Sequence, residues 1–300
     1  QFSSVKVVIL FIIFFIGMPY NVVKFSQRKL YMVKKTNLVI AGCTGRMGKM
    51  ILDILPKNQN FNLVGLLEKS GHPDIGKDYS KVNQASTFDL DISDNYKETL
   101  SKADVLIDFT LPEATLHSLE LTKGMDINHV IGTTGFSSAE EEKISMYARS
   151  KTIVKAGNMS LGVNLITKLT EMVASTLDEE FDIEILEMHH KEKIDAPSGT
   201  ALMLGEAAAK GRDVSLEDVK DLDRTNVRAK RNHGNIGFSA LRGGDVVGEH
   251  SVIFAGFGER IVISHIANNR EIFARGALKA AQWTLNKEPK LYSMLDVLGI

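Results

Sequence analysis

The sequence predicts an α/β protein with a doubly wound parallel sheet and a smaller α/β domain that contains a mixed sheet. Three observations lead to this prediction. Short apolar segments alternate with helix-like segments from residue 37 to residue 156, a pattern typical of parallel strands joined by right-handed helical crossovers. A glycine-rich loop follows the first apolar segment and opens the first helix-like segment. After residue 160, one long helix-like segment is followed by strand-like runs.

The first half of the chain supplies the parallel sheet. Its apolar runs are short, and each is followed by a helix-like or turn-like stretch, as in successive strand–helix units. We expect strands at 37–41, 61–67, 104–109, 128–132 and 152–156, and helices at 46–55 and 112–124.

The second half supplies the mixed sheet. A long helix after Ser160 leads to strands that we expect at 181–188, 235–242, 246–256 and 259–266. The segment 243–245 (Gly-Gly-Asp) has the composition of a tight turn, so it predicts a β-hairpin between the second and third of these strands. The segment 270–286 is again helix-like, with an Ala-rich face, and no internal repeat or Pro-rich linker is present in the sequence.

Composition and charge exclude several classes of protein. The 300 residues, 44% hydrophobic and 24% charged, are typical of a globular protein of one large or two modest domains. A formal net charge of -1 gives no general attraction for nucleic acid or a membrane surface, so we expect neither as a partner. The single cysteine, Cys43, rules out an intrachain disulfide and a Cys-rich zinc site, and it fits a reducing compartment.

Residues 1–31 are expected to lie outside the fold. The run 7–16 (VVILFIIFFI) is apolar throughout, but it is shorter than the roughly 20 residues that a membrane-spanning helix needs. It has the length of a signal-peptide core, yet no convincing small-x-small cleavage site follows it. A start at Met32 is a further alternative, because MVKKTNLVIAG leads directly into the first strand. We favour an upstream extension over a targeting segment and expect it to be dispensable.

The glycine loop AGCTGRMGKM lies where a dinucleotide-binding loop should lie. Gly42, Gly45 and Gly48 permit a tight turn, close approach of the backbone to a pyrophosphate, and close packing of the helix on the strand. The helix N-terminus also offers N–H groups to phosphate. The spacing is G-x-x-G-x-x-G, with Thr44 where the commoner dinucleotide-binding motif has glycine, and by itself it is only weak evidence for dinucleotide binding. Glu68 strengthens it, because a carboxylate at the end of the second strand accepts hydrogen bonds from ribose hydroxyls.

The two residues at the end of the second predicted strand favour different cofactors. Glu68 favours NADH because its carboxylate repels a 2′-phosphate, whereas the adjacent Lys69 can neutralise that phosphate. We therefore expect both NADH and NADPH to be used. The segments 108–110 and 132–135 end the next two predicted strands, at the carboxyl edge of the sheet where ligands of such folds bind.

In the segment 184–202 (EILEMHHKEKIDAPSGTAL), a group of polar and charged residues follows the end of a strand-like run. A lone histidine is often a core or surface residue, and the lysines alone would suit a solvated face. The spacing is not that of an HExxH zinc site, so no metal is expected. Taken together, histidine for proton transfer near neutral pH, a compact lysine charge and a helix that opens on Ser-Gly-Thr describe a carboxylate pocket. The residues predict a small acidic substrate beside a hydride carrier.

From about residue 32 to its end, the chain resembles the 4-hydroxy-tetrahydrodipicolinate reductase (dihydrodipicolinate reductase) family. The resemblance rests on GCTGRMG, LLEK, DFT, GTTGF, AGNMSLGVN, ExHHxxKxDAPSGTA, RGGDVVGEH and ANNREIFARGAL, which occur in the family's order. It implies that His189 is the catalytic acid/base, that Lys193 is a proton donor, and that His190, Gly199 and Thr200 bind substrate carboxylates. It also implies that NADH or NADPH contacts Gly42, Cys43, Thr44, Gly45, Arg46, Met47, Glu68, Lys69, Gly132, Thr133, Thr134, Ala156, Gly157, Asn158 and Met159.

The resemblance further implies an oxidoreductase of lysine and diaminopimelate biosynthesis that reduces 4-hydroxy-tetrahydrodipicolinate, a small dicarboxylate, with loss of water. It implies a Rossmann-type dinucleotide-binding domain formed by 32–160 and 271–300, and a substrate-binding domain at 161–270 that also forms a homotetramer. It implies a cytoplasmic location. The chain departs from the family's pattern at Thr44, at Gly157 and Met159, and in the N-terminal extension.

The residues are also consistent with two other functions. One is a related dehydrogenase of the aspartate pathway that acts on a semialdehyde or an amino acid. The HHxxK and Ser-Gly-Thr segments favour a cyclic dicarboxylate over these substrates. The other is a non-catalytic, dinucleotide-binding regulator, which has no need for His189 and Lys193.

Overall fold

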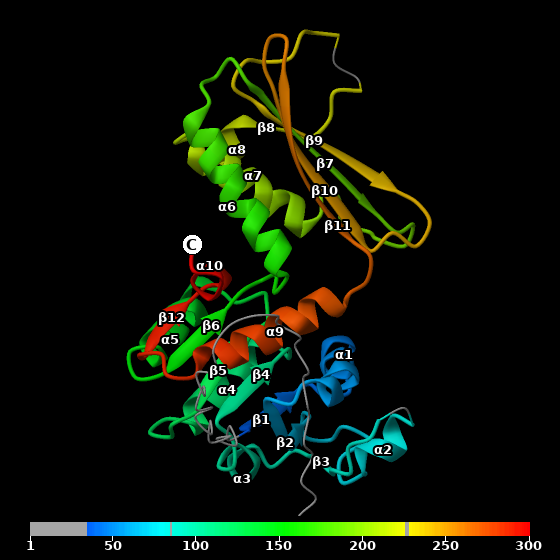
Figure 1. Ribbon diagram of the computed structural model, residues 1–300, viewed down its shortest axis with the longest axis vertical. Coiled ribbons are helices and arrows are strands. Elements are labelled where there is room, and N and C mark those ends of the chain that lie inside the picture. The colour runs from blue at the N-terminus through cyan, green and yellow to red at the C-terminus, as the bar shows by residue number, and fades with distance from the viewer. Residues whose placement is uncertain (1–34, 85, 226–227) are drawn as a thin grey trace, which may run out of the picture. The chain divides into compact units, whose positions relative to one another are not determined.

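The computed structural model describes residues 35–300, except residues 85, 226 and 227. The extension 1–31, for which the sequence predicts a place outside the fold, lies outside the described residues, and so does Met32, near which the fold is predicted to start. Within the described residues, the strands form two separate sheets, each with its own helices (Figure 1).

A seven-stranded parallel sheet is built mainly from the first half of the chain. Its strand order is β12-β6-β5-β4-β1-β2-β3, and all of its strand pairs are parallel. Because β2 and β4 lie on opposite sides of β1, the strand order reverses at β1, and ligands of doubly wound sheets bind at such a point. The strands are β1 (Thr36–Ala41), β2 (Phe61–Leu67), β3 (Ile92–Ser93), β4 (Val105–Asp108), β5 (Asn128–Ile131), β6 (Thr152–Lys155) and β12 (Lys290–Tyr292).

Helices from both ends of the chain accompany this sheet. The C-terminal helix α9 (Glu271–Thr284) contacts α1 and the strands β4, β5 and β6, and its Ala-rich face allows close approach. Its buried alanines share one apolar core with residues of β1 and α1. The other helices are α1 (Arg46–Ile54), the 3₁₀ turn η1 (Leu55–Lys57), α2 (Tyr79–Val82), α3 (Tyr96–Leu100), α4 (Pro112–Leu121), α5 (Ser138–Tyr147) and α10 (Met294–Leu298).

The second sheet is mixed and has five strands, in the order β11-β10-β7-β9-β8. Its central strand β7 is parallel to β9 and antiparallel to β10. The helices α6 and α7 lie side by side, and their apolar residues share a core with the sheet (Figure 1). The elements are α6 (Leu161–Thr176), β7 (Asp182–His189), α7 (Gly199–Gly211), α8 (Leu216–Val219), β8 (Lys220–Asp221), β9 (Ile236–Arg242), β10 (Gly248–Ala255) and β11 (Arg260–Ala267).

The predicted hairpin at 243–245 is wrong, because β7 lies between β9 and β10. The Gly-Gly-Asp segment instead crosses the end of β7. The Gly243 N–H donates to the His189 carbonyl at 2.9 Å, and the Lys191 N–H donates to the Gly244 carbonyl at 3.2 Å. Gly244 has φ 55°, a conformation that glycine adopts without strain. The segment is therefore a turn, as its composition indicates, but it connects two strands that are separated by β7 instead of two strands of a hairpin.

The predicted fold class is confirmed: a Rossmann-like parallel sheet is accompanied by a second, mixed sheet. The predicted strands agree with the observed ones to within about two residues, and β2 matches 61–67 at both ends. In the described part of the chain, no helix is long and apolar enough to cross a membrane.

Close packing of α9 on the loop after β6 gives a stability prediction. A Cβ at Gly276 would lie 1.7 Å from the Met159 carbonyl oxygen, a backbone atom that cannot rotate aside. We predict that Gly276→Ala destabilises the fold by about 1–3 kcal/mol through overpacking, although alanine favours a helix by about 1 kcal/mol. Urea unfolding followed by circular dichroism measures the effect. Gly199→Ala is the control, since a Cβ there meets no atom within 4 Å; equal midpoints for both variants would contradict the prediction.

Candidate active site

One hollow lies at the carboxyl ends of β1, β2 and β4, beside the strand-order reversal. It has a volume of about 290 Å³ and takes its walls from the loops that follow these strands. It is a largely apolar recess with one acidic and one basic side chain, Glu68 and Lys69. Its lining residues are Gly42, Thr44, Gly45, Glu68, Lys69, Tyr96, Phe109, Thr110, Leu111 and Ala114.

The glycine loop in this hollow has the geometry of a pyrophosphate cradle. Gly42 has φ 74°, and a Cβ there would lie 3.0 Å from the Phe109 carbonyl oxygen. A Cβ at Gly48 would lie 2.1 Å from the Gly42 carbonyl oxygen, so only glycine lets α1 pack this closely. Gly45 is the N-cap of α1 and has no side chain to cap it. The first N–H groups of α1 therefore remain for an anion, and the residues fit a dinucleotide.

Several predicted cofactor residues turn their side chains away from the hollow. The side chains of Cys43 and Met159 are buried in the apolar core, and Met47 packs against it. Burial, with the nearby charge of Glu68, raises the pKa of the Cys43 thiol to about 12. Cys43 and Met159 therefore offer a ligand only backbone atoms, whereas Met47 is partly exposed. Arg46, by contrast, is exposed at the first position of α1.

A second hollow, of about 480 Å³, brings together residues from both sheets. The loops after β5 and β6 contribute three of the predicted cofactor residues. The end of β7, the β7–α7 loop and the start of α7 together contribute all five residues for which the sequence predicts catalysis or carboxylate binding. The Asn158 side-chain amide donates to the Thr200 hydroxyl at 3.1 Å, so the two sets of loops touch. The lining residues are Thr134, Gly157, Asn158, His189, His190, Lys193, Ser198, Gly199, Thr200, Met203, Val247, Arg270 and Phe273.

His189 ends β7 and is held by a buried carboxylate. Its Nδ1 lies 2.6 Å from Oε2 of Glu187, whose side chain is only 1% exposed. Burial alone would raise the pKa of Glu187, but the hydrogen bonds from Arg242 and His189 outweigh it and keep that pKa below its ordinary value. Because ionised Glu187 only accepts hydrogen bonds, we assign the proton of neutral His189 to Nδ1. Nε2 has no hydrogen-bond partner among the described residues and is left for a ligand.

Glu187 joins three elements. Arg242, at the end of β9, donates from its two terminal nitrogens to the two oxygens of Glu187 at 2.8 Å each. The Ser198 N–H, just before α7, donates to Oε1 at 3.1 Å. With His189, the carboxylate therefore has four donors, which offset the cost of burying its charge.

The pKa of His189 lies below its ordinary value. Burial is the main cause, and the cations Lys193 and Arg242 act in the same direction, while the hydrogen bond and charge of Glu187 oppose them. The imidazole is therefore mainly neutral at pH 7, with Nε2 able to take up a proton. His250 packs edge-on to His189 at a ring separation of 5.1 Å. Burial and the proximity of His189 lower the pKa of His250 to about 4, so it stays neutral.

Lys193 lies at the mouth of the second hollow. Its Nζ is 2.8 Å from both carboxylate oxygens of Asp195, which is mostly exposed. This ion pair lowers the pKa of Asp195. The pairing keeps the ammonium close to the β7–α7 loop, and because Asp195 is solvated, an anionic ligand can replace it at modest cost.

The start of α7 has the geometry of an anion site, so the predicted carboxylate binding by Gly199 and Thr200 stays a prediction that this geometry allows. Ser198 is the N-cap, and its hydroxyl accepts from the Ala201 N–H, as predicted. That bond leaves the N–H groups of Gly199 and Thr200 for a ligand. A Cβ at Gly199 would meet no atom within 4 Å, so the helix start faces open space.

Four residues around this hollow were not predicted from the sequence: Glu187, Arg242, His250 and Arg270. Glu187 left a signal, because residues two apart on a strand point to the same face, and it lies two before His189. Arg242 and His250 are placed by strand pairing: Arg242 lies opposite His189 across β9 and β7, and His250 lies opposite Glu187 across β10 and β7. Arg270 approaches His190, with Nη2 to Nε2 at 3.3 Å.

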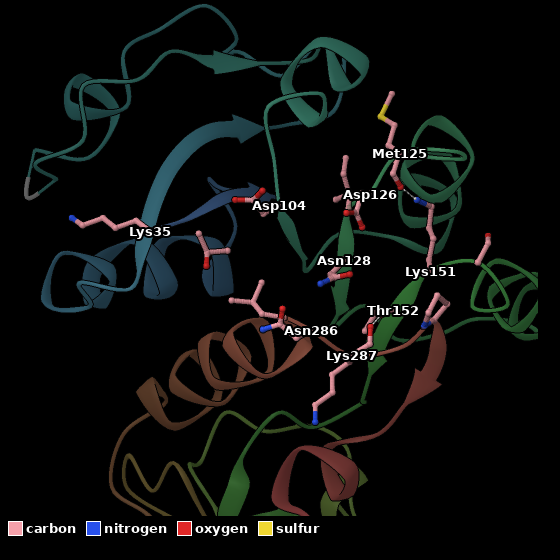
Figure 2. A pocket seen from close by; sticks show the side chains of 14 residues that line it. Lys35, Asp104, Met125, Asp126, Asn128, Lys151, Thr152, Asn286 and Lys287 are labelled. Atoms are coloured by element: carbon pink, nitrogen blue, oxygen red, sulfur yellow. Dashed lines mark hydrogen bonds between the residues drawn. The ribbon is translucent and has the colours of Figure 1, made fainter. Parts of the chain in front are cut away.

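A further hollow, of about 500 Å³, lies at the opposite edge of the parallel sheet (Figure 2). It is lined by residues near the amino ends of β1, β5 and β6, and it contains none of the predicted site residues. Its buried Lys151 donates to the Met125 carbonyl at 2.9 Å, as the dashed line in Figure 2 marks. No trio of metal-ligating side chains is found in this hollow or elsewhere in the described ranges. The second hollow is the candidate active site, because it holds the residues predicted for catalysis and carboxylate binding, although the two hollows are similar in size.

Comparison with known proteins agrees with this geometry. A family model described as "Dihydrodipicolinate reductase, N-terminus" matches residues 36–159, and one described as "Dihydrodipicolinate reductase, C-terminus" matches residues 162–298. A 4-hydroxy-tetrahydrodipicolinate reductase from Dinoroseobacter shibae is 51% identical over 263 residues, covering 88% of this chain and 98% of that protein. A protein of the same name from Brucella abortus is 52% identical over 264 residues, with 88% and 98% covered.

A solved structure gives the same fold. A dipicolinate-bound dihydrodipicolinate reductase from Paenisporosarcina sp. TG-14 superposes with a TM-score of 0.71 and covers 86% of this chain and 97% of that chain. Its sequence identity is 24%, so the likeness concerns the arrangement of helices and strands.

The hydrogen bond between His189 and Glu187 gives a prediction for titration. The carboxylate favours the protonated imidazole, so Glu187→Gln removes that support and leaves Arg242 without its counter-ion. We predict that the pKa of His189 falls further, and that its titration curve moves to lower pH. NMR of histidine-labelled protein, assigned with His189→Asn, measures the curve. Glu192→Gln is the control, since that exposed carboxylate lies in the same loop; an unchanged or higher pKa in Glu187→Gln would contradict the assignment.

Proposed function

The chain belongs to the dihydrodipicolinate reductase family, and we propose that it reduces 4-hydroxy-tetrahydrodipicolinate to tetrahydrodipicolinate and water with NADH or NADPH. The observation that carries the proposal is the second hollow. There, the free Nε2 of His189, the ammonium of Lys193 and the open start of α7 face the loops of the dinucleotide-binding sheet. We place the reaction in lysine and diaminopimelate biosynthesis, in the cytoplasm.

The substrate's carboxylates account for one part of the site. We propose that Gly199 and Thr200 bind a carboxylate through their free N–H groups, with His190 as a further donor. Arg270, 3.3 Å from His190, adds positive charge at the same point. A helix N-terminus and charged donors together favour a dianion over a neutral or monoanionic substrate, which argues against the semialdehyde and amino-acid alternatives.

Proton handling accounts for the other part. Bound nicotinamide supplies the hydride, and a proton is needed so that the substrate hydroxyl leaves as water. We propose that neutral His189 takes a proton at Nε2 from the ring carbon beside the hydroxyl-bearing carbon, because Glu187 fixes the imidazole through Nδ1, and returns that proton to the substrate ring as the hydride adds. Lys193 donates the one proton with which the hydroxyl leaves as water, so one hydride and one proton are consumed in all, and its ammonium balances the substrate's charge. Such positioned acid–base groups contribute about 10²–10⁴-fold to a rate.

The two sheets support a division into two domains, because α9, near the end of the chain, packs on the parallel sheet and β12 is one of its strands. We propose that 32–160 and 271–300 form the dinucleotide-binding domain and that 161–270 form the substrate-binding and tetramerisation domain. Closure of the two domains would exclude water from the hydride-transfer site. The contact between Asn158 and Thr200 is already made across this boundary.

An assay tests the function directly. The substrate is generated enzymatically, and oxidation of NADPH or NADH is followed by absorbance. Turnover with this substrate and none with aspartate semialdehyde is the expected result. Turnover with the semialdehyde would favour the aspartate-pathway alternative, and dinucleotide binding without any turnover would favour a regulator.

Substitutions in the β7–α7 loop test the assigned roles. We predict that His189→Ala and Lys193→Ala each lower kcat by about 10²-fold or more, while the Kd for NADH barely changes. Lys191→Ala is the matched control, because Lys191 is an exposed lysine of the same loop. Near-normal turnover in both test variants would remove these residues from the mechanism.

The open face of the mixed sheet is proposed as the tetramer interface. Val262 and Ile266 on β11 are 49% and 60% exposed, and Leu186 on β7 and Leu241 on β9 are also exposed. An apolar sheet face that ends in an unpaired edge strand invites association with copies of the chain. The full chain should therefore sediment as a tetramer.

We predict that the double variant Val262→Lys, Ile266→Lys sediments as smaller species, because four or more copies of each charge would be buried at the interface. Sedimentation velocity measures this. Met146→Lys, on exposed α5 outside the face, should remain tetrameric. A monomeric wild type, or a tetrameric double variant, would show that this face is not the interface.

A further inference from the structure

Thr44 occupies the position in the glycine loop where the commoner fingerprint has glycine, and its side chain is fully engaged. The Thr44 hydroxyl lies 2.6 Å from Oε1 of Glu68, and the Thr44 N–H donates to the same oxygen at 2.9 Å. Nε2 of His72, in the loop after β2, lies 3.3 Å from the Thr44 hydroxyl oxygen. Three side chains from two loops thus form one chain of polar contacts at the wall of the first hollow.

The direction of these hydrogen bonds follows from their partners. The Asp74 N–H donates to Nδ1 of His72 at 3.3 Å, so in the neutral ring Nε2 carries the proton. Nε2 therefore donates to the Thr44 oxygen, and the single hydroxyl proton of Thr44 is left for Glu68, since a carboxylate only accepts. The relay runs from His72 through Thr44 to Glu68.

The relay determines what Glu68 can do for a ligand. Its Oε1 already has two short hydrogen bonds from Thr44, whereas among the described residues Oε2 has only the 3.3 Å contact with the Lys69 N–H. The remaining acceptor capacity is thus on Oε2. Glu68 is buried, and the carboxylate cannot rotate away from the hollow without breaking both bonds to Thr44.

We propose that Thr44 is a specificity-determining residue, which fixes Glu68 against the adenosine ribose and so sets the discrimination between NADH and NADPH. This inference rests on the proposed use of a pyridine dinucleotide. A fixed carboxylate accepts a hydrogen bond from a 2′-hydroxyl without losing side-chain entropy. The same fixed charge cannot move away from a 2′-phosphate, so it repels NADPH more than a mobile carboxylate would.

His72 acts through Thr44 as a positioning residue. It does not line the hollow, so it affects a bound dinucleotide only by orienting the Thr44 hydroxyl. The exposed Lys69 acts in the opposite sense, because its charge attracts the 2′-phosphate. The preference of the protein is then set by the balance between the Thr44–Glu68 contact and Lys69.

Dissociation constants measured by calorimetry test the proposal without any enzymatic turnover. The full chain is titrated with NADH and NADPH, and with 5′-AMP and 2′,5′-ADP, which differ by the 2′-phosphate alone. Thr44→Val removes the hydroxyl but keeps the branched shape and the backbone N–H. We expect the ratio of Kd for NADH to Kd for NADPH to rise by about tenfold, equivalent to about 1.4 kcal/mol, and the two adenosine nucleotides to change in parallel.

Two further variants complete the test. Thr44→Ser keeps a hydroxyl and should keep the wild-type ratio, and His72→Ala should shift the ratio in the same direction as Thr44→Val, by a smaller factor. If Thr44→Val does not fold, the shift in His72→Ala decides the question. An unchanged ratio, or equal weakening of both cofactors, would overturn this inference alone. A wild type that binds neither dinucleotide would overturn the proposed function with it.

Discussion

The buried carboxylate of Glu187 is the interaction on which the candidate site depends. Its two oxygens receive hydrogen bonds from the ring of His189, the guanidinium of Arg242 and the N–H of Ser198. These donors come from the ends of β7 and β9 and from the start of α7. A buried charge is tolerated only when its partners are held in place, so the ion pair positions the histidine and the helix start relative to each other.

The strand order supplies the second constraint. The parallel sheet reverses its order at β1, which opens the hollow where the glycine loop lies. The loops after β5 and β6 follow at the same edge and meet the β7–α7 loop, as the hydrogen bond from Asn158 to Thr200 shows. One edge of the parallel sheet can therefore hold a dinucleotide along its length and present its reactive end to the residues around Glu187. In the proposed function, cofactor binding and acid–base chemistry therefore lie on separate elements.

Local patterns in the sequence sufficed for the fold class and for most strand positions, because these depend on short-range spacing. They also indicated that polar residues gather where β7 ends, and these residues line one hollow. The order of the mixed sheet did not follow from local pattern: Gly-Gly-Asp has hairpin composition, yet β7 inserts between β9 and β10. Arg242 reaches Glu187, and His250 reaches His189 and the Ser198 hydroxyl, only through that long-range pairing. Likewise, the spacing of the glycine loop showed that Thr44 was unusual, but its contact with Glu68 required the relative placement of two loops.

The most direct test of this account is a crystal structure of the protein with NADH and dipicolinate, a planar dicarboxylate. The account predicts that one carboxylate accepts hydrogen bonds from the N–H groups of Gly199 and Thr200, and that the ring lies between the nicotinamide and Nε2 of His189. The Glu187 carboxylate should keep its bond to Nδ1. A dicarboxylate bound elsewhere, such as in the hollow around Lys151, or a His189 ring turned away from Glu187, would contradict it.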